Sequence, residues 1–388
     1  MIVRRTLLWS GFPKSFGLAH PAFMIPVFHP SARPVKAVVD LSALAHNVAL
    51  VRQRAHPAKV FAVVKANAYG HGLARVLPAL GSADALALIE LEAAIWLRAL
   101  GWRKPILLLE GFFNADELDT YAEHALSCTV HHESQVRALA DASLPRALDI
   151  FIKVNSGMNR LGFAPDDVAH VVTRLRGSRS VKSLTLMTHL AAADELDGVA
   201  EPVAGFRELA AKFDLPVSLA NSAGVLRYPE VGGDIVRPGI MLYGASPSTT
   251  PAALLRLKPV MTLQSALIAV QHLAAGDAVG YGGGYRATRP ERIGIVACGY
   301  ADGYPRQAND KTPLAVGGVM THPVGRVSMD MIAIDITHIP QADVGTPVEL
   351  WGQNIAVDEV AASAGTIGYE LLTRVTQRVP FEVTGLTP

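Results

Sequence analysis

Between residues 59 and 244 the chain alternates short apolar segments with amphipathic ones, and this alternation constrains the fold more than any other feature. The apolar segments are rich in leucine and β-branched residues and lie at 60–64, 85–89, 106–109, 127–130, 149–154, 183–188, 217–219 and 235–236. Segments with helical periodicity lie at 41–56, 73–80, 91–100, 115–124, 133–140, 165–175, 199–213 and 222–227. Strands interleaved with helices are typical of parallel βα units. Eight such units in about 200 residues favour an α/β fold of the (β/α)8 barrel type, although the periodicity alone would also fit an open parallel sheet.

The sequence changes in character after Gly244. A linker-like segment at 246–251 is followed by short apolar runs, which are separated by turns rich in Gly, Pro and Asp and lie at 261–269, 292–297, 331–336 and 347–350. This pattern predicts a second, all-β domain. At roughly 150 residues per domain, the 388 residues allow two or three domains. We therefore expect a poorly ordered N-terminal extension at 1–34, a barrel at 35–245 and a β-rich C-terminal domain at 246–388.

Composition and charge exclude several classes of protein. Half of the residues are hydrophobic and 18% are charged, which is too apolar for a disordered chain. Lys and Arg total 35 against 34 Asp and Glu, and this balance argues against a nucleic-acid-binding protein. The two cysteines, Cys128 and Cys298, cannot form a disulfide framework, and no stretch of about 18 residues is apolar enough to span a bilayer. These features predict a cytoplasmic enzyme that binds neither nucleic acid nor a membrane.

Polar and charged residues gather where the predicted strands end, which is where the loops of a βα barrel carry the chemistry. Lys65 follows the first strand. In the structural interpretation, the aliphatic part of the Lys65 side chain packs in the core and its ammonium group extends to water. In the functional interpretation, burial lowers the pKa of Lys65 so that the neutral amine forms a Schiff base with a carbonyl. The other residues of this kind follow the fifth to eighth strands and are Lys153, Arg160, His189, Asn221, Ser222 and Arg237. Each has an ordinary structural explanation, such as a helix cap or a satisfied buried histidine, but a barrel would bring them all around one mouth.

A mouth of this composition suits an anionic ligand. Ser222 and the backbone amides of Gly239 and Ile240 follow the seventh and eighth strands, where barrels often bind phosphate. A phosphate site opposite a Schiff-base lysine describes a pocket for pyridoxal phosphate. The alternative without a cofactor is an aldolase in which Lys65 condenses directly with a sugar phosphate.

The segment from Val63 to Gly72, which reads VVKANAYGHG, resembles the cofactor-lysine motif of bacterial alanine racemases. The resemblance continues in order along almost the whole of residues 35–385, at 156–163, 188–190, 221–223, 237–239, 241–244, 280–282, 299–304, 325–330 and 368–374. It implies a pyridoxal phosphate barrel joined to a β-domain, with the strand near 35–41 belonging to the β-domain. It also implies a homodimer whose active sites are shared between subunits, and it implies no metal.

The resemblance assigns roles to individual residues. Lys65 would hold the cofactor and act as one of two acid/base groups at the substrate Cα, and Tyr281 of the partner subunit would be the other, since inversion needs a group on each face. Lys153 matches a lysine that is carbamylated in some members and braces Arg160. The residues that would contact the cofactor are Lys65, Tyr69, Arg160, His189, Asn221, Ser222, Arg237, Gly239, Ile240 and Tyr369. Those that would contact or confine the substrate are Arg160, Tyr300, Met329 and Asp330.

Arg237 favours racemisation over decarboxylation. By resemblance it faces the pyridine nitrogen, and because arginine has no acceptor it leaves that nitrogen unprotonated. Related barrel decarboxylases place a carboxylate there. The expected activity is therefore interconversion of L- and D-alanine for peptidoglycan synthesis, although a catabolic isozyme would carry the same motifs. The alternatives are another pyridoxal enzyme on this barrel, such as a decarboxylase, a racemase for another small amino acid, or a non-catalytic carrier of the cofactor. Ser328 departs from the cysteine that often precedes the Met-Asp pair.

Overall fold

Eight short strands pair in parallel and close into a barrel in the computed structural model of the chain, which describes residues 32–195, 198–228 and 231–385. In chain order they are β2 (Lys59–Val63), β3 (Ala85–Leu88), β4 (Ile106–Leu108), β5 (Ser127–Val130), β6 (Leu148–Lys153), β7 (Val181–Met187), β8 (Val217–Ser218) and β9 (Ile235–Val236). Strand β2 pairs with both β3 and β9, which closes the ring. The barrel is thus confirmed, and the open sheet that the periodicity also allowed is excluded.

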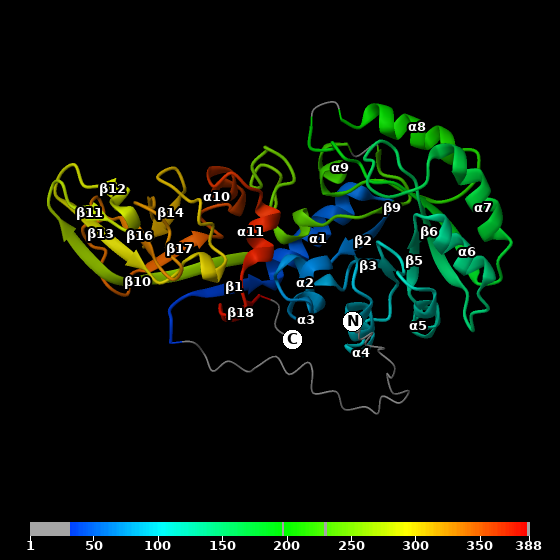
Figure 1. Ribbon diagram of the computed structural model, residues 1–388, viewed down its shortest axis with the longest axis horizontal. Coiled ribbons are helices and arrows are strands. Elements are labelled where there is room, and N and C mark those ends of the chain that lie inside the picture. Colours follow the sequence, from blue (N-terminus) through cyan, green and yellow to red (C-terminus); the bar gives the residue numbers. More distant parts are fainter. Residues whose placement is uncertain (1–31, 196–197, 229–230, 386–388) are drawn as a thin grey trace, which may run out of the picture. The chain divides into compact units, whose positions relative to one another are not determined.

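The strands are mostly apolar because helices cover them on the outside and side chains fill the inside. Every residue of β3, β4 and β5 is buried. The helices of this part are α1 (Leu41–Ala55), α2 (Lys65–Tyr69), α3 (Leu73–Val76), α4 (Leu91–Ala99), α5 (Leu118–Glu123), α6 (Glu133–Asp141), α7 (Val168–Arg176), α8 (Ala200–Ala210) and α9 (Ser222–Arg227). Short 3-10 turns accompany them: η2 (Leu77–Leu80), η3 (Ala115–Glu117), η4 (Pro165–Asp167) and η6 (Ile240–Tyr243). Figure 1 shows these helices surrounding the strands.

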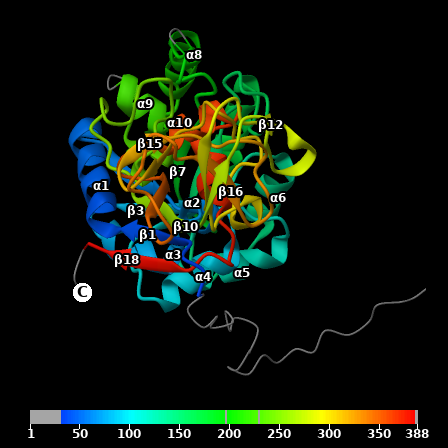
Figure 2. The same ribbon diagram turned by 90° about the vertical axis from the view of Figure 1, so that its left-hand side faces the viewer.

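The second part of the chain is built around an eight-stranded sheet. Its strands are β1 (Lys36–Asp40), β10 (Met261–Leu273), β13 (Glu291–Val296), β14 (Leu314–Val316), β15 (Val319–Thr321), β16 (Ile332–Asp335), β17 (Pro347–Trp351) and β18 (Phe381–Thr384). The long strand β10 joins it together by pairing with β1, β13 and β17. Strands β11 (Ala278–Val279) and β12 (Tyr285–Arg286) form a separate hairpin, with the turn η7 (Tyr281–Gly283) between them. Figure 2 views the molecule from the side on which this sheet lies.

Strand β1 connects the sheet to the barrel. It pairs with β10 and β18, and Asp40 at its end caps helix α1 by accepting hydrogen bonds from the amides of Ser42 and Ala43. A side-chain acceptor at this position satisfies amides that have no partner within the helix. The first strand of the chain therefore lies in the sheet, while the helix that directly follows it packs on the barrel strand β2.

Two helices correct the expectation of an all-β second domain. They are α10 (Val357–Ser363) and α11 (Gly368–Arg374), and they pack against each other. Each is only two turns long, too short for its periodicity to stand out from a buried strand segment. Helix α10 buries Val357, Val360 and Ala361. The helix expected at 73–80 is divided into α3 and the 3-10 turn η2, in which Pro78 is the second residue.

Most of the predicted N-terminal extension, residues 1–31, lies outside the described residues. Arg33, which the same prediction placed in the extension, makes defined contacts with Asp302. No helix within the described ranges combines the length and the apolar character that a membrane crossing requires.

Candidate active site

Lys65 lies directly after barrel strand β2, at the start of a left-handed turn. Ala66, Asn67, Ala68 and Tyr69 all have φ between 51° and 56°. Left-handed backbone costs energy for residues with a Cβ, so a run of four persists only where the surroundings hold it. The Ala68 amide donates to the Val64 carbonyl, and the Asn67 side chain accepts from the Leu73 amide. Lys65 and Tyr69 thus stand at the two ends of this turn.

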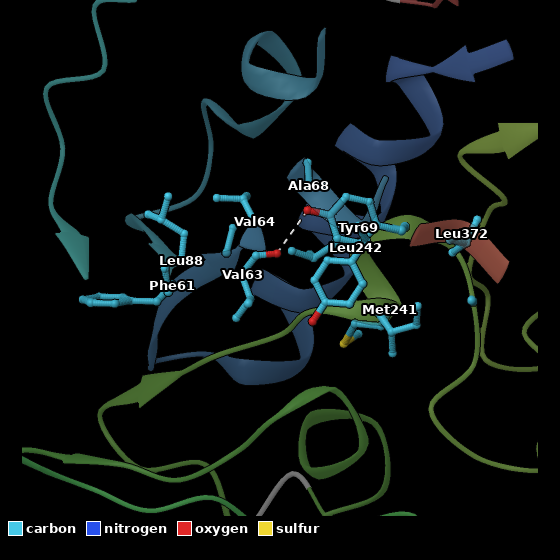
Figure 3. Packing of buried hydrophobic residues seen from close by; sticks show 14 of the residues in the cluster. Phe61, Val63, Val64, Ala68, Tyr69, Leu88, Met241, Leu242 and Leu372 are labelled. Carbon is cyan, nitrogen blue, oxygen red and sulfur yellow. Dashed lines mark hydrogen bonds between the residues drawn. The ribbon is translucent and has the colours of Figure 1, made fainter. Parts of the chain in front are cut away.

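The rings of His71, Tyr243 and Tyr69 pack in a row next to this turn. His71 lies within hydrogen-bond distance of the Ala68 and Tyr69 carbonyls through Nδ1, at 3.0 and 2.9 Å. Burial lowers the pKa of His71 to about 4, so its ring is neutral near pH 7 and Nδ1 is the nitrogen that donates. The His71 ring centroid lies 4.7 Å from that of Tyr243, which in turn stacks on Tyr69 at 4.7 Å. Figure 3 shows Ala68 and Tyr69 in the buried cluster beside Val64 and Leu242.

Helix α11 of the second part closes over the same turn. A Cβ on Gly70 would lie 2.1 Å from the Leu372 carbonyl oxygen, so only glycine permits this close approach. The Tyr369 ring lies 6.1 Å from Tyr69. Tyr369 was predicted as a site residue only from the family resemblance, and helix α11, which carries it, was not predicted.

Ser222, Gly239 and Tyr69 form a small polar cluster beside the turn. The Ser222 Oγ accepts from the amides of Gly239 (2.9 Å) and Met241 (3.4 Å). A Cβ on Gly239 would lie 2.2 Å from the Tyr69 hydroxyl, so the hydroxyl occupies the space that a side chain would need. The Gly239 amide was one of the two predicted to bind an anion, but in the structure it donates its hydrogen bond to Ser222. Asn221 caps α9 through the Gly224 amide and donates to the Leu190 carbonyl.

Five basic side chains interact electrostatically in the same mouth: Lys65, Lys153, Arg160, His189 and Arg237. Burial and then the charge of Arg160 lower the pKa of Lys65, while Glu110 and Glu90 raise it. Burial, Arg237 and Arg160 lower the pKa of Lys153 to about 8. The same causes lower the pKa of His189 to about 3, which keeps its ring neutral. Several cationic groups gathered around one neutral imidazole are the arrangement expected of a site that binds anions.

Arg237 is buried and fixed in orientation. Its guanidinium donates to the Ser218 hydroxyl and to the Thr188 carbonyl. Burial lowers the pKa of Arg237 to about 10, so it remains protonated at neutral pH. These two hydrogen bonds leave further N–H groups for a ligand in the mouth.

Arg160 lies in an irregular loop that Asn155 organises. The Asn155 Oδ1 accepts from the amides of Gly157 and Asn159, and its amide nitrogen donates to the Asn159 side chain. Lys153, Arg160 and His189 line one small cavity with the intervening loop. The barrel residues that the sequence selected thus include one interacting group around these three, joined by Lys65 and Arg237. A second group consists of Tyr69, Ser222 and Gly239.

Of the predicted residues of the second part, Tyr369 lies next to Tyr69, whereas Tyr281, Tyr300, Met329 and Asp330 do not lie at the barrel mouth of their own chain. Tyr281 is 73% exposed and lies in the turn between β11 and β12, which Figure 1 shows at the end of the sheet away from the barrel. Met329 is 52% exposed. Tyr300 and Asp330 lie beside it, because the Tyr300 amide donates to Ser328 and the Ala301 amide donates to Met329. Tyr300, Met329 and Asp330 therefore form a partly exposed edge of their own.

Sequence reasoning gave no role to Tyr243, His71 or Asp302. Tyr243 and His71 both lie in segments that carried the family resemblance, but nothing in a linear sequence indicates that their rings stack. Asp302 follows Tyr300 by two residues, and a carboxylate in a Gly-rich turn reads as an ordinary solvated loop residue. Its complete burial shows otherwise.

Family models match most of the chain. The N-terminal domain of alanine racemase matches residues 39–247 and its C-terminal domain matches residues 260–383. The catabolic alanine racemase of Klebsiella aerogenes is 55% identical over 350 residues, which cover 90% of this chain and 98% of that protein. The catabolic enzyme of Salmonella typhimurium is 53% identical over 91% of this chain and 99% of its own length.

Solved structures agree with this result. The biosynthetic alanine racemase of Pseudomonas aeruginosa has a TM-score of 0.88 at 46% identity, covering 91% of this chain and 99% of that one. The alanine racemase of Bartonella henselae with covalently bound pyridoxal phosphate has a TM-score of 0.82 at 28% identity, covering 92% and 100%. This chain therefore belongs to the alanine racemase family.

Proposed function

We propose that the protein is a homodimeric racemase that interconverts L- and D-alanine with pyridoxal phosphate bound at the barrel mouth. The observations that carry the proposal are the group of basic side chains that includes Lys65 and the cluster of Ser222, Gly239 and Tyr69 at the same barrel. The nucleophile and the anion-binding groups lie at the same end of one barrel, as a cofactor with an aldehyde and a phosphate requires.

The residues present fit this cofactor. Lys65 would attach it covalently, since its lowered pKa favours the neutral amine that reacts with a carbonyl. The hydroxyls of Ser222 and Tyr69, the Ile240 amide and Tyr369 would bind the phosphate. His189 would contact the ring face, and Arg160 its phenolic oxygen. When bound, pyridoxal phosphate acidifies the Cα proton of an attached amino acid.

Inversion at Cα requires one group to remove the proton from one face and a second to return a proton to the opposite face. We assign Lys65 to one face and Tyr281 of the partner subunit to the other. The exposure of Tyr281 on a turn outside its own barrel mouth supports a role in a second subunit. Its phenol, like any tyrosine, needs nearby positive charge to act as a base, and the basic side chains of the mouth would supply that charge.

Arg237 supports racemisation rather than decarboxylation. It stays protonated and is held by Ser218 and Thr188, so it can donate to a pyridine nitrogen but cannot protonate it. An unprotonated pyridine ring withdraws less electron density from Cα, which suits a reversible proton exchange.

The substrate itself would be bound by residues of both subunits. Arg160 and the Met329 backbone of the partner subunit would bind the substrate carboxylate. Tyr300 and Asp330 of the partner subunit would restrict the substrate side chain to a small one.

We further propose that Lys153 carries a carbamate that braces Arg160. The pKa of Lys153 is lowered to about 8, so its neutral amine is available near neutral pH, and a carbamate would turn one of several mutually repelling cations into an anion. Protein exchanged into carbon-13 bicarbonate at pH 8 should show a carbamate carbon signal that weakens as the pH falls. The signal should be missing from Lys153→Ala, and its absence from the unaltered protein would exclude the modification.

The proposed setting is the cytoplasm, where D-alanine would supply peptidoglycan synthesis. Purified protein with added pyridoxal phosphate should convert either enantiomer of alanine to the racemate, followed by circular dichroism or a D-amino-acid oxidase assay. Release of carbon dioxide without D-alanine would replace racemisation with decarboxylation. Faster conversion of serine than of alanine would shift the substrate to another small amino acid.

A further inference from the structure

Asp302 is a carboxylate buried completely beneath the exposed edge that carries Tyr300, Met329 and Asp330. Its Oδ1 accepts from Arg33 and from Arg378, both at 2.8 Å. Its Oδ2 accepts from Arg33 at 2.9 Å and from the Gly299 amide at 2.9 Å. A buried carboxylate is tolerated when charged donors and amides satisfy it in this way.

The two arginines also reach the edge itself. Arg33 donates to the Asp330 carbonyl oxygen at 3.2 Å, and Arg378 pairs with the Asp330 carboxylate at 2.5 Å. Each arginine therefore bridges the buried Asp302 and the half-exposed Asp330. The contacts join four segments that lie far apart in the sequence, around residues 33, 302, 330 and 378.

The loops above Asp302 are fixed to each other by backbone contacts. The Tyr300 amide donates to Ser328 at 3.1 Å and the Ala301 amide to Met329 at 3.0 Å. A Cβ on Gly299 would lie 2.4 Å from the carbonyl oxygens of both Ser328 and Met329. A shift of Asp302 would therefore be transmitted to the Met329 and Asp330 backbone.

We propose that Asp302, Arg33 and Arg378 form a positioning cluster that holds Asp330 and the Met329 backbone in place for the substrate carboxylate and neutralises Asp330 beside it. This rests on the proposed function, in which the Met329 and Asp330 edge confines the substrate. The two arginines balance the two carboxylates. Loss of Arg378 leaves Asp330 with an uncompensated negative charge where an anionic group must approach.

Replacing Arg378 with alanine should raise KM for both alanine enantiomers about tenfold, with a smaller change in kcat. The covalently bound cofactor should be retained, because the cluster contacts none of the barrel residues around Lys65. Arg378→Lys should give an intermediate KM, because an ammonium keeps the charge but cannot span both carboxylates as a guanidinium does. Arg52→Ala, which breaks an exposed arginine–aspartate pair of 3.0 Å between α1 and Asp84, is the matched control and should leave KM unchanged.

A double variant separates positioning from mere stability. The double variant Arg378→Ala/Asp330→Asn has no uncompensated charge at position 330. Its KM should therefore lie close to the KM of Asp330→Asn alone, and below the KM expected if the effects of the two single substitutions were added. A lowered melting temperature with unchanged KM in Arg378→Ala, or purely additive effects in the double variant, would overturn the proposal. If the unaltered protein does not racemise alanine at all, that result overturns the proposed function. Retention of the cofactor in the variants would then not support the role proposed for the cluster.

Discussion

Replacing Lys65 with alanine should abolish racemisation and with it the visible absorbance of covalently attached pyridoxal phosphate. Lys65 stands two residues beyond the end of β2, at the start of the left-handed turn 66–69. Its pKa is lowered by burial and by Arg160, which favours the reactive neutral form. No other group in the variant would both bind the cofactor and move the Cα proton, so we expect activity to fall by at least about ten-thousand-fold. Absorbance spectra and D-alanine formation measure the two effects.

Lys153 provides the matched control, since it is a second half-buried lysine whose pKa is also lowered by burial and by Arg160. In Lys153→Ala we expect the absorbance of the attached cofactor to remain, with a weaker activity. If instead the absorbance persists in Lys65→Ala and disappears in Lys153→Ala, the cofactor lysine is Lys153 and the assignment of Lys65 is wrong.

Replacing Tyr281 with phenylalanine should lower kcat by about a hundred- to ten-thousand-fold, because the variant lacks one of the two proton-transfer groups. The two kcat values should fall unequally for L- and D-alanine, while kcat/KM stays equal in both directions, as an equilibrium constant of one requires. In deuterated water Lys65 should still exchange the Cα proton on its own face. One enantiomer should therefore gain deuterium without inverting.

The same substitution at Tyr285 is the control for Tyr281. Tyr285 lies in the same hairpin, with its hydroxyl bonded to Glu291, and we expect its replacement by phenylalanine to leave both kcat values within a few-fold of the unaltered enzyme. Deuterium exchange into both enantiomers, or a small and equal effect of Tyr281→Phe in the two directions, would contradict the two-base assignment.

The barrel could be predicted from sequence because each of its strands is a separate apolar run. The run at 127–130 matches β5 at both ends, and 235–236 matches β9. Since chemistry in a barrel lies after the strand ends, the positions of Lys65, Lys153 and Arg237 in the sequence already placed them at one mouth. Their mutual effects on pKa agree with that placement.

What could not be predicted depends on contacts distant in sequence or on unusual backbone. The left-handed turn after Lys65 leaves no pattern in a sequence of small residues, because its stability comes from His71 and the rings below it. Helix α11 is too short to be recognised. Arg33 lies 269 residues from Asp302, so the positioning cluster became visible only in three dimensions.

The central claim is that each catalytic site combines Lys65 of one subunit with Tyr281 of its partner, and mixing two inactive variants tests it most directly. Lys65→Ala and Tyr281→Ala should each be inactive alone. Unfolded together in equal amounts and refolded with pyridoxal phosphate, half of the dimers should be mixed and each should hold one intact site, so about a quarter of the unaltered activity should return. If the mixture stays as inactive as its components while the unaltered enzyme recovers fully from the same treatment, the two residues do not act in a shared site.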